Sequence, residues 1–230
     1  MDRSDTDEAV QHIFPGWALS GELYAPYENI AKKTIVHDAG FFSKSDKGSI
    51  ALSPDGQCFI TAHSMGSLFA LKAAVSSENV KALILFSPFA RFTSCKSYEA
   101  QDHESIDVMK KHLDSNPEAL LKSFWRKMAK PENLTINIPG FFNVPRLKEG
   151  LDVLANCDVR ELLSEIRVPV LIFQGTGDLI SSVATASFVN GNIPHSKLVM
   201  IEKAGHAIPF TKTRECIEKM KSFLAEAFQK

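Results

Sequence analysis

A serine, an aspartate and a histidine each follow an apolar stretch of this chain, and together they could form a nucleophilic site. Ser64 lies within "CFITAHSMGS", where an apolar run reaches a polar turn and a helical pattern begins. Asp178 follows "VLIFQGTG", and His206 follows "KLVMIEKAG". A serine hydroxyl attacks a carbonyl only when an imidazole takes its proton and a carboxylate orients that imidazole. We therefore predict that Ser64 is the nucleophile, His206 the base and Asp178 the acid.

The residues around Ser64 favour a sharp strand-to-helix turn. Ala62 and Gly66 stand two residues before and after it, which matches the G-x-S-x-G pattern with Ala in place of the first Gly. The small residues suit a turn in which strand and helix approach closely. The alternative is an ordinary loop in which Ser64 only caps the helix. We do not expect His63 to act as the base, because the residue before such a serine points away from it.

The acid and the base are predicted from their positions after strands. Active sites of parallel sheets gather at the carboxyl ends of the strands, and the order nucleophile, acid, base is typical of one such fold. Gly205, beside His206, is expected to provide backbone freedom. The alternatives are an exposed turn for Asp178 and a helix cap for His206. Asp38 and Asp158 are alternative acids.

Acyl transfer also needs N–H donors for the oxyanion. The turn after Ser64 offers the backbone N–H of Met65. The second donor is expected from "FPGWALSG", where Gly16 allows a turn and the N–H of Trp17 can point inward. The alternative is that Trp17 is a plain core aromatic.

Six apolar runs predict the strands that position these residues, and most are continuous, as in strands covered on both faces. They span residues 12–17, 33–39, 58–63, 80–88, 168–175 and 197–204, with helical patterns at 65–77 and 214–228. This alternation predicts an α/β fold with a mostly parallel central sheet flanked by helices. From about 90 to 165, amphipathic patterns predict a helical cap inserted in the second half of a single domain spanning 1–230.

Composition restricts the class of protein. The 26 Lys and Arg residues nearly balance the 27 Asp and Glu residues, which argues against a nucleic-acid binder. The four cysteines are scattered without a C-x-x-C pair, as in proteins that keep thiols reduced. The acidic start lacks a signal-peptide pattern, and no apolar run reaches the length of a membrane span. We expect a cytoplasmic monomer without membrane contact, metal or organic cofactor.

Beyond these patterns, the chain resembles the α/β-hydrolase superfamily over nearly its whole length, in "HDAGFFSKS" among other segments. It is most similar to the pimeloyl-[acyl-carrier protein] methyl ester esterases of biotin synthesis. That similarity lies in "PGW", "FSPFARF", "GLDVLANCDVRELLSEIRVPVLIFQGTGDLI" and "PHSKLVMIEKAGHAIPF". The resemblance implies the α/β-hydrolase fold, the triad Ser64, Asp178 and His206, and the oxyanion donors Trp17 and Met65.

The resemblance also implies a substrate, the methyl ester of a pimeloyl chain on acyl carrier protein, and basic cap residues that meet the acidic carrier. The cap offers Lys122, Arg126, Lys127, Lys130, Arg146 and Lys148. Of these, Arg126, Lys127, Arg146 and Lys148 are the candidate carrier contacts, and the alternative is a solvated face.

Two features depart from the family pattern. We expect a shortened N-terminus with the leading strands missing or reduced, and residues 40–58 leave little room for the usual helix. We expect a serine esterase whose ester substrate is a small molecule or is carrier-bound. The alternatives are a short-chain carboxylesterase, a thioesterase, a carbon–carbon hydrolase or a non-catalytic protein that binds a ligand.

Overall fold

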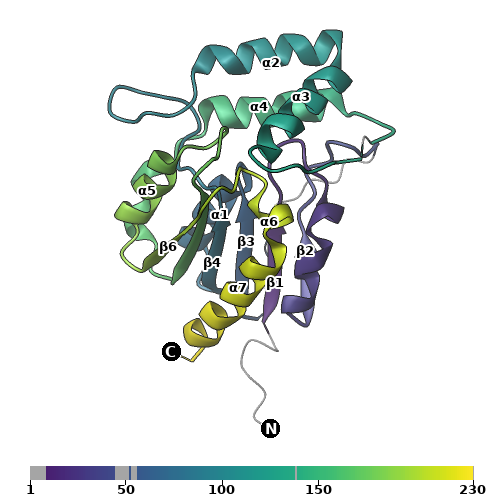
Figure 1. The fold of residues 1–230 in the computed structure, drawn as a ribbon. Coiled ribbons are helices and arrows are strands. Elements are labelled where there is room, and N and C mark those ends of the chain that lie inside the picture. The colour runs from purple at the N-terminus through teal and green to yellow at the C-terminus, as the bar shows by residue number, and fades with distance from the viewer. Residues whose placement is uncertain (1–8, 45–51, 53–55, 138, 230) are drawn as a thin grey trace.

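The core of the molecule is one parallel sheet of six strands (Figure 1). The computed structural model describes residues 9–44, 52, 56–137 and 139–229. The strands lie in the order β2-β1-β3-β4-β5-β6. They are β1 (Val10–Phe14), β2 (Lys33–Val36), β3 (Cys58–His63), β4 (Val80–Phe86), β5 (Val170–Gly175) and β6 (Ser196–Ile201). Each overlaps one of the six predicted apolar runs, and the predicted α/β fold with a parallel sheet is confirmed.

Helices cover both faces of the sheet, which explains the continuous apolar strands. The helix α1 (Gly66–Ser76) packs on β3 and β4, and α5 (Val183–Asn192) packs on β5 and β6. The helix α7 (Thr213–Ala227) covers the opposite face together with the 3-10 helix η2 (Gly21–Ile30) (Figure 1). Every residue of β3 and β5 is buried as a result.

Sequence patterns did not predict η2 and α5. The segment that forms η2 contains Pro26 and shows no regular apolar repeat. Two tyrosines hold it to the core, since Tyr24 and Tyr27 are fully buried. The hydroxyl of Tyr27 donates a hydrogen bond to the carbonyl of Pro209, 2.7 Å away in the short helix α6 (Ile208–Thr211). Contacts between distant segments, rather than local propensity, therefore determine this element.

Three helices between β4 and β5 lie above the carboxyl ends of the strands (Figure 1). They are α2 (His103–Ser115), α3 (Pro117–Ala129) and α4 (Val144–Asn156), and a 3-10 helix η3 (Arg160–Glu165) leads back to the sheet. Polar caps define where all three begin, and at α2 the side chain of Asp102 accepts from the N–H of Glu104. The side chain of Asn116 accepts from the N–H of Ala119, and that of Asn143 accepts from the N–H of Arg146. We call this helical layer the cap.

Part of the segment expected to lack room for a helix, residues 45–51 and 53–55, lies outside the described residues. Within the described part of the chain, no helix is both long and apolar enough to span a bilayer.

Candidate active site

Ser64 occupies a strained turn between β3 and α1. Its backbone φ of 54° lies in the left-handed region that residues other than glycine rarely adopt. The turn is tight because Gly66 packs on β1, where an added Cβ would overlap the carbonyl oxygen of Phe14. The hydroxyl of Ser67 donates to the carbonyl of Ser64 at 2.5 Å and secures the turn from the helix side. Ala62, in the position of the usual first glycine, fits within β3 beside Phe14.

Asp178 follows β5 and is held by several donors. Its Oδ1 accepts from the backbone N–H groups of Ile180 and Ser181 at 2.8 and 2.9 Å. Its Oδ2 accepts from Nδ1 of His206 at 2.8 Å, and both side chains are buried. Burial alone would raise the pKa of Asp178, but the adjacent His206 and the backbone donors lower it overall. The group is therefore a carboxylate at neutral pH.

The hydrogen bond to Asp178 determines the tautomer of His206. A carboxylate can only accept, so Nδ1 of His206 carries a proton, and in the neutral imidazole the free lone pair is then on Nε2. This Nε2 is buried and has no hydrogen-bond partner among the described residues, so no bond to Ser64 is formed in this structure. Catalytic hydrogen bonds are often long in free enzymes and shorten when substrate binds. This tautomer is the one that a general base requires.

His63 is the middle member of a chain of hydrogen bonds next to this site. Its Nε2 lies 2.9 Å from the carbonyl oxygen of His206, which can only accept, so Nε2 carries the proton. Its Nδ1 therefore accepts from the hydroxyl of Tyr24 at 2.8 Å, and that hydroxyl accepts in turn from the N–H of Gly16. The chain of bonds runs from the loop after β1 to the loop that carries His206. Both ring nitrogens of His63 are occupied.

The loop after β1 packs directly against the turn of Ser64. A Cβ added at Gly16 would lie 3.2 Å from Cβ of Ser64. The next residue is Trp17, one of the predicted oxyanion donors. Within the described part of the chain, neither its backbone N–H nor that of Met65 has a hydrogen-bond partner. Two free N–H groups near one serine are what oxyanion stabilisation requires.

Two tryptophans join the cap to the core at this loop. The indole N–H of Trp17 donates to the carbonyl of Leu147 in α4 at 2.8 Å. In the opposite direction, the indole N–H of Trp125 in α3 donates to the carbonyl of Ala18 at 2.9 Å. Trp17 is buried, so its side chain is a packed aromatic while its main chain borders Ser64 through Gly16.

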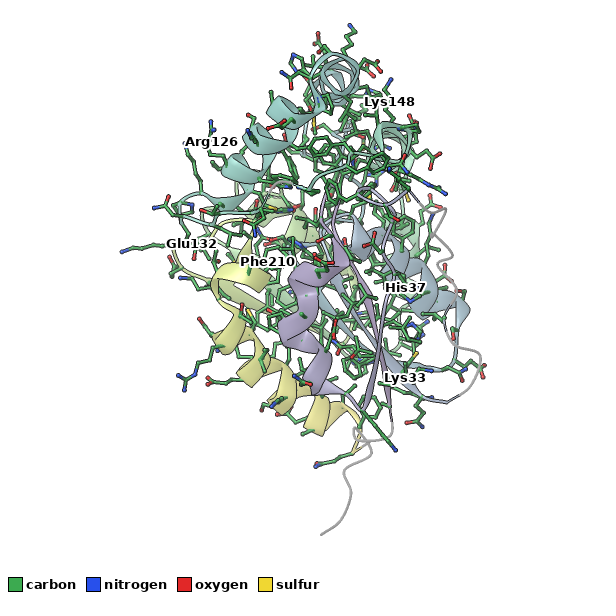
Figure 2. All side chains as sticks on the ribbon, turned by 90° about the vertical axis from the view of Figure 1, so that its right-hand side faces the viewer. Lys33, His37, Arg126, Glu132, Lys148 and Phe210 are labelled. Carbon is green, nitrogen blue, oxygen red and sulfur yellow. The ribbon has the colours of Figure 1, made fainter. Side chains whose placement is uncertain are left out.

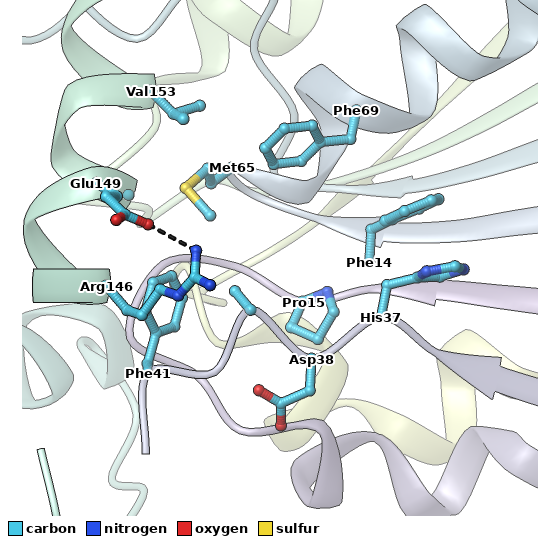
Figure 3. A pocket seen from close by; sticks show the side chains of 12 residues that line it. Phe14, Pro15, His37, Asp38, Phe41, Met65, Phe69, Arg146, Glu149 and Val153 are labelled. Atoms are coloured by element: carbon cyan, nitrogen blue, oxygen red, sulfur yellow. Dashed lines mark hydrogen bonds and ion pairs between the residues drawn. The ribbon is translucent and has the colours of Figure 1, made fainter. Parts of the chain in front are cut away.

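A cavity of about 240 Å³ opens beside Met65, between the cap and the sheet (Figure 3). Its apolar wall includes Phe14, Phe69 and Val153. At its polar side Arg146 forms an ion pair with Glu149 at 2.8 Å. The cavity offers an apolar volume next to one of the predicted oxyanion donors.

The candidate carrier contacts differ in how they are paired. Lys148 binds Asp114 at 2.6 Å, and Arg146 binds Glu149, so both are already engaged within the cap. Arg126 and Lys127 lie in the last turn of α3 and make no ion pair with any described residue. Figure 2 shows Arg126 and Lys148 projecting from the cap.

The two alternative acids have other partners. Asp38 accepts from the backbone N–H groups of Gly21 and Gly40. Asp158 pairs with Arg160 and Arg91, and the hydrogen bond from Arg160 is the largest cause that lowers its pKa to about 2. Neither carboxylate is bonded to His206.

Sequence reasoning did not predict the roles of two residues around the acid and the base. One is His63, which was considered only as a base, although its polar ring at the end of an apolar strand signalled a buried partner. The other is Gln174 at the end of β5, whose amide donates to Asp178 at 3.3 Å and to the carbonyl of Ser181 at 3.0 Å. A buried glutamine in "VLIFQG" was again the signal. No group of three or more His, Cys, Asp or Glu within the described residues is arranged to hold a metal ion.

Known proteins resemble this chain in sequence and in fold. A pimeloyl-[acyl-carrier protein] methyl ester esterase from Aliivibrio salmonicida is 25% identical over 240 residues, covering 92% of this chain and 90% of the relative. One of the same name from Neisseria meningitidis is 29% identical over 73% of this chain and 69% of its own length.

Solved structures give the same picture of the fold. An esterase from Exiguobacterium antarcticum superposes with a TM-score of 0.80 at 20% identity, covering 98% of this chain and 93% of its own. MenH from S. aureus superposes with a TM-score of 0.78 at 20% identity, covering 100% of this chain and 96% of its own. The family model Hydrolase_4, described as serine aminopeptidase, S33, matches residues 33–212. The chain therefore belongs to the Hydrolase_4 family and has the α/β-hydrolase fold expected from its sequence.

Proposed function

We propose that this chain is a serine esterase that hydrolyses the methyl ester of a pimeloyl chain carried on acyl carrier protein. The observation that carries the proposal is the buried bond between Asp178 and His206, which directs Nδ1 of His206 to the carboxylate and leaves Nε2 without a partner among the described residues. The strained turn of Ser64 supports it. The substrate is proposed from the relatives of that name, which align with 92% of this chain.

In the proposed mechanism, Oγ of Ser64 attacks the ester carbonyl while Nε2 of His206 takes its proton. The N–H groups of Trp17 and Met65 bind the oxyanion of the tetrahedral intermediate. Asp178 holds the imidazole in the required tautomer and stabilises the imidazolium that forms. Collapse of the intermediate breaks the bond to the methoxy group, which takes the proton from His206 and leaves as methanol. Water then attacks the acyl-enzyme by the same steps and releases the carboxylate and Ser64.

The surroundings of Ser64 are compatible with an acyl chain. The cavity beside Met65 is lined mainly by apolar side chains and can take methylene groups. The carrier is proposed to dock on the cap, where Arg126 and Lys127 have charges that no described acid neutralises. Arg146 and Lys148 would meet the carrier only by exchanging their present partners.

The test uses Ser64→Ala, because the change removes the nucleophile and leaves the backbone able to form the same turn. Wild type is expected to hydrolyse p-nitrophenyl butyrate and the carrier-bound methyl ester, with the variant slower by at least about 10³-fold. A fluorophosphonate probe is expected to label Ser64 in the folded wild type only. Expression of wild type, but not the variant, is expected to restore biotin formation in cells lacking their own esterase.

Two results would contradict the proposal at different levels. Equal turnover by wild type and Ser64→Ala, or no adduct at Ser64, would exclude serine chemistry, and turnover at only the uncatalysed rate in both would favour a non-catalytic binding protein. Hydrolysis of the small ester without hydrolysis of the carrier-bound ester would exclude the substrate and favour a short-chain carboxylesterase. Cys157→Ser is a matched control, since this partly buried thiol lies outside the proposed mechanism.

A further inference from the structure

The end of the cap helix α3 lies against both loops that carry the acid and the base. Gly205 precedes His206, and an added Cβ there would overlap the carbonyl oxygen of Lys130. Gly177 precedes Asp178, and an added Cβ there would lie 2.9 Å from Cδ of Pro131. The cap segment 128–132 is therefore in direct contact with the residue before Asp178 and the residue before His206.

Glu132 makes the contact with the base loop specific. Its Oε2 accepts from the backbone N–H of Gly205 at 3.1 Å and from the hydroxyl of Thr211 at 3.0 Å. Its Oε1 pairs with Lys212 at 2.9 Å. The side chain of Glu132 is only 16% exposed, so these bonds are partly shielded from water. Figure 2 shows Glu132 between the cap and the C-terminal helices.

The backbone around His206 is thereby held at three consecutive residues. The N–H of Gly205 binds Glu132, and the N–H of Ala207 donates to the carbonyl of Met128 at 3.1 Å. The carbonyl of His206 itself accepts from His63. Two of these three bonds come from the cap. A rotation of this backbone would move Nε2 of His206, and errors of about 1 Å at a reacting group can cost about 10²-fold in rate.

We propose that Glu132 is a positioning residue through which the cap fixes the orientation of His206. This inference deepens the proposed function and rests on it. The carboxylate holds Gly205, and the imidazole is aligned for proton transfer from Ser64. Without this carboxylate the base loop loses a charged acceptor at the residue before His206.

The competing explanation is that Glu132 only anchors the C-terminal helix through its ion pair with Lys212. The two roles use different oxygens, so they can be separated. Lys212→Met removes the ion pair and keeps the bonds to Gly205 and Thr211. Glu132→Ala removes all of them. Glu132→Gln keeps one carbonyl oxygen that can accept from both Gly205 and Thr211.

The experiment measures kcat and KM for p-nitrophenyl butyrate in these variants. We expect Glu132→Ala to lower kcat by about 10-fold or more with KM within about twofold, because the effect is on alignment rather than on binding. Glu132→Gln is expected to recover kcat to within about threefold of wild type. Lys212→Met is expected to keep kcat within about twofold even where its melting temperature falls. Equal kcat losses in Glu132→Ala and Lys212→Met would overturn the proposal.

A spectroscopic readout reports the base directly. The Nδ1 proton of His206, shared with Asp178, is expected to give a downfield proton NMR signal in wild type and Lys212→Met. The signal is expected to broaden or disappear in Glu132→Ala, and an unchanged signal together with unchanged kcat refutes the proposal. If Glu132→Ala does not fold, Glu132→Asp decides, since its shorter carboxylate withdraws from the backbone N–H of Gly205, whereas the flexible side chain of Lys212 can follow it. Lost kcat in Glu132→Asp supports the proposal and wild-type kcat overturns it.

Failure of this inference is distinct from failure of the proposed function. A wild-type protein that neither hydrolyses esters nor is labelled at Ser64 contradicts the esterase. An active wild type with an equally active, folded Glu132→Ala contradicts only the role of Glu132.

Discussion

Acidification should destabilise this protein through His63 before its carboxylates are protonated. The ring of His63 is fully buried, and its two nitrogens are committed to Tyr24 and to the carbonyl of His206. Protonation of Nδ1 would turn this acceptor into a donor, and the hydroxyl of Tyr24 could then no longer donate its hydrogen bond to it. Burial, and then the adjacent His206, lowers the pKa of His63 from 6.5 to about 3.

The sign and size of the effect follow from proton linkage. Below pH 6.5 His63 is protonated in the unfolded chain, but in the folded chain it stays neutral until about pH 3. The free energy of unfolding therefore decreases as the pH falls through this window. At pH 5, about 1.5 units below the unfolded value, the loss is roughly 2 kcal/mol at about 1.36 kcal/mol per unit. Burial, then His37 and Lys33, lowers the pKa of His12 to about 4, so His12 contributes a similar loss.

Urea unfolding at pH 7 and pH 5 measures this loss. Wild type is expected to lose roughly 4 kcal/mol of unfolding free energy between these values, a large part of the about 5–15 kcal/mol typical of a domain. His63→Gln keeps an N–H donor for the carbonyl of His206 but cannot gain a proton. Its loss is expected to be roughly 2 kcal/mol, from His12 alone. If wild type and His63→Gln lose the same unfolding free energy between pH 7 and pH 5, His63 is not the source of this acid sensitivity.

Two further predictions concern the elbow and the cap. Gly66→Ala should lower the melting temperature and abolish ester turnover, because its methyl would overlap the carbonyl of Phe14. The control is Gly191→Ala in α5, where an added Cβ meets open space, and it should leave the melting temperature and turnover unchanged. An active, stable Gly66→Ala would contradict the tight elbow. Charge reversal at Arg126 and Lys127 should raise KM for the carrier-bound ester by about 10-fold and leave p-nitrophenyl butyrate unaffected. Equal effects on both substrates would argue against carrier docking on α3.

Much of the fold and the approximate site could be predicted because strand topology determines them. Parallel strands that share a sheet bring their carboxyl ends to one edge, so residues after β3, β5 and β6 had to meet there. That reasoning predicted Ser64, Asp178 and His206 from three distant segments, and the structure joins the last two by a hydrogen bond. It could not predict that the bond from Ser64 to His206 is absent, because sub-ångström placement depends on packing.

Buried polar contacts across the fold were less predictable. In the hydrogen-bond chain through His63, Tyr24 is 39 residues and His206 is 143 residues away from His63 in the sequence. Nothing in local propensity indicates such partners, since each depends on which helices cover the sheet. A polar residue in an apolar strand, such as His63 or Gln174, still signals that a partner must exist, because an unpaired buried polar group is costly.

The glycine beside His206 shows how a correct residue can be given a wrong reason. The sequence interpretation expected Gly205 to supply backbone freedom, but it does not adopt a positive φ, and only Gly40 and Gly56 do so among the described glycines. Its requirement is space, since the carbonyl of Lys130 occupies the position of a side chain. Gly177 beside Asp178 meets Pro131 in the same way. Sequence spacing could not distinguish the two reasons because the constraint comes from the cap. Gly177 before the acid and Gly205 before the base are therefore the two positions where the cap packs against the loops of the site. A side chain at either position would displace the cap segment or the loop, so the inserted helices and the position of the catalytic groups depend on each other.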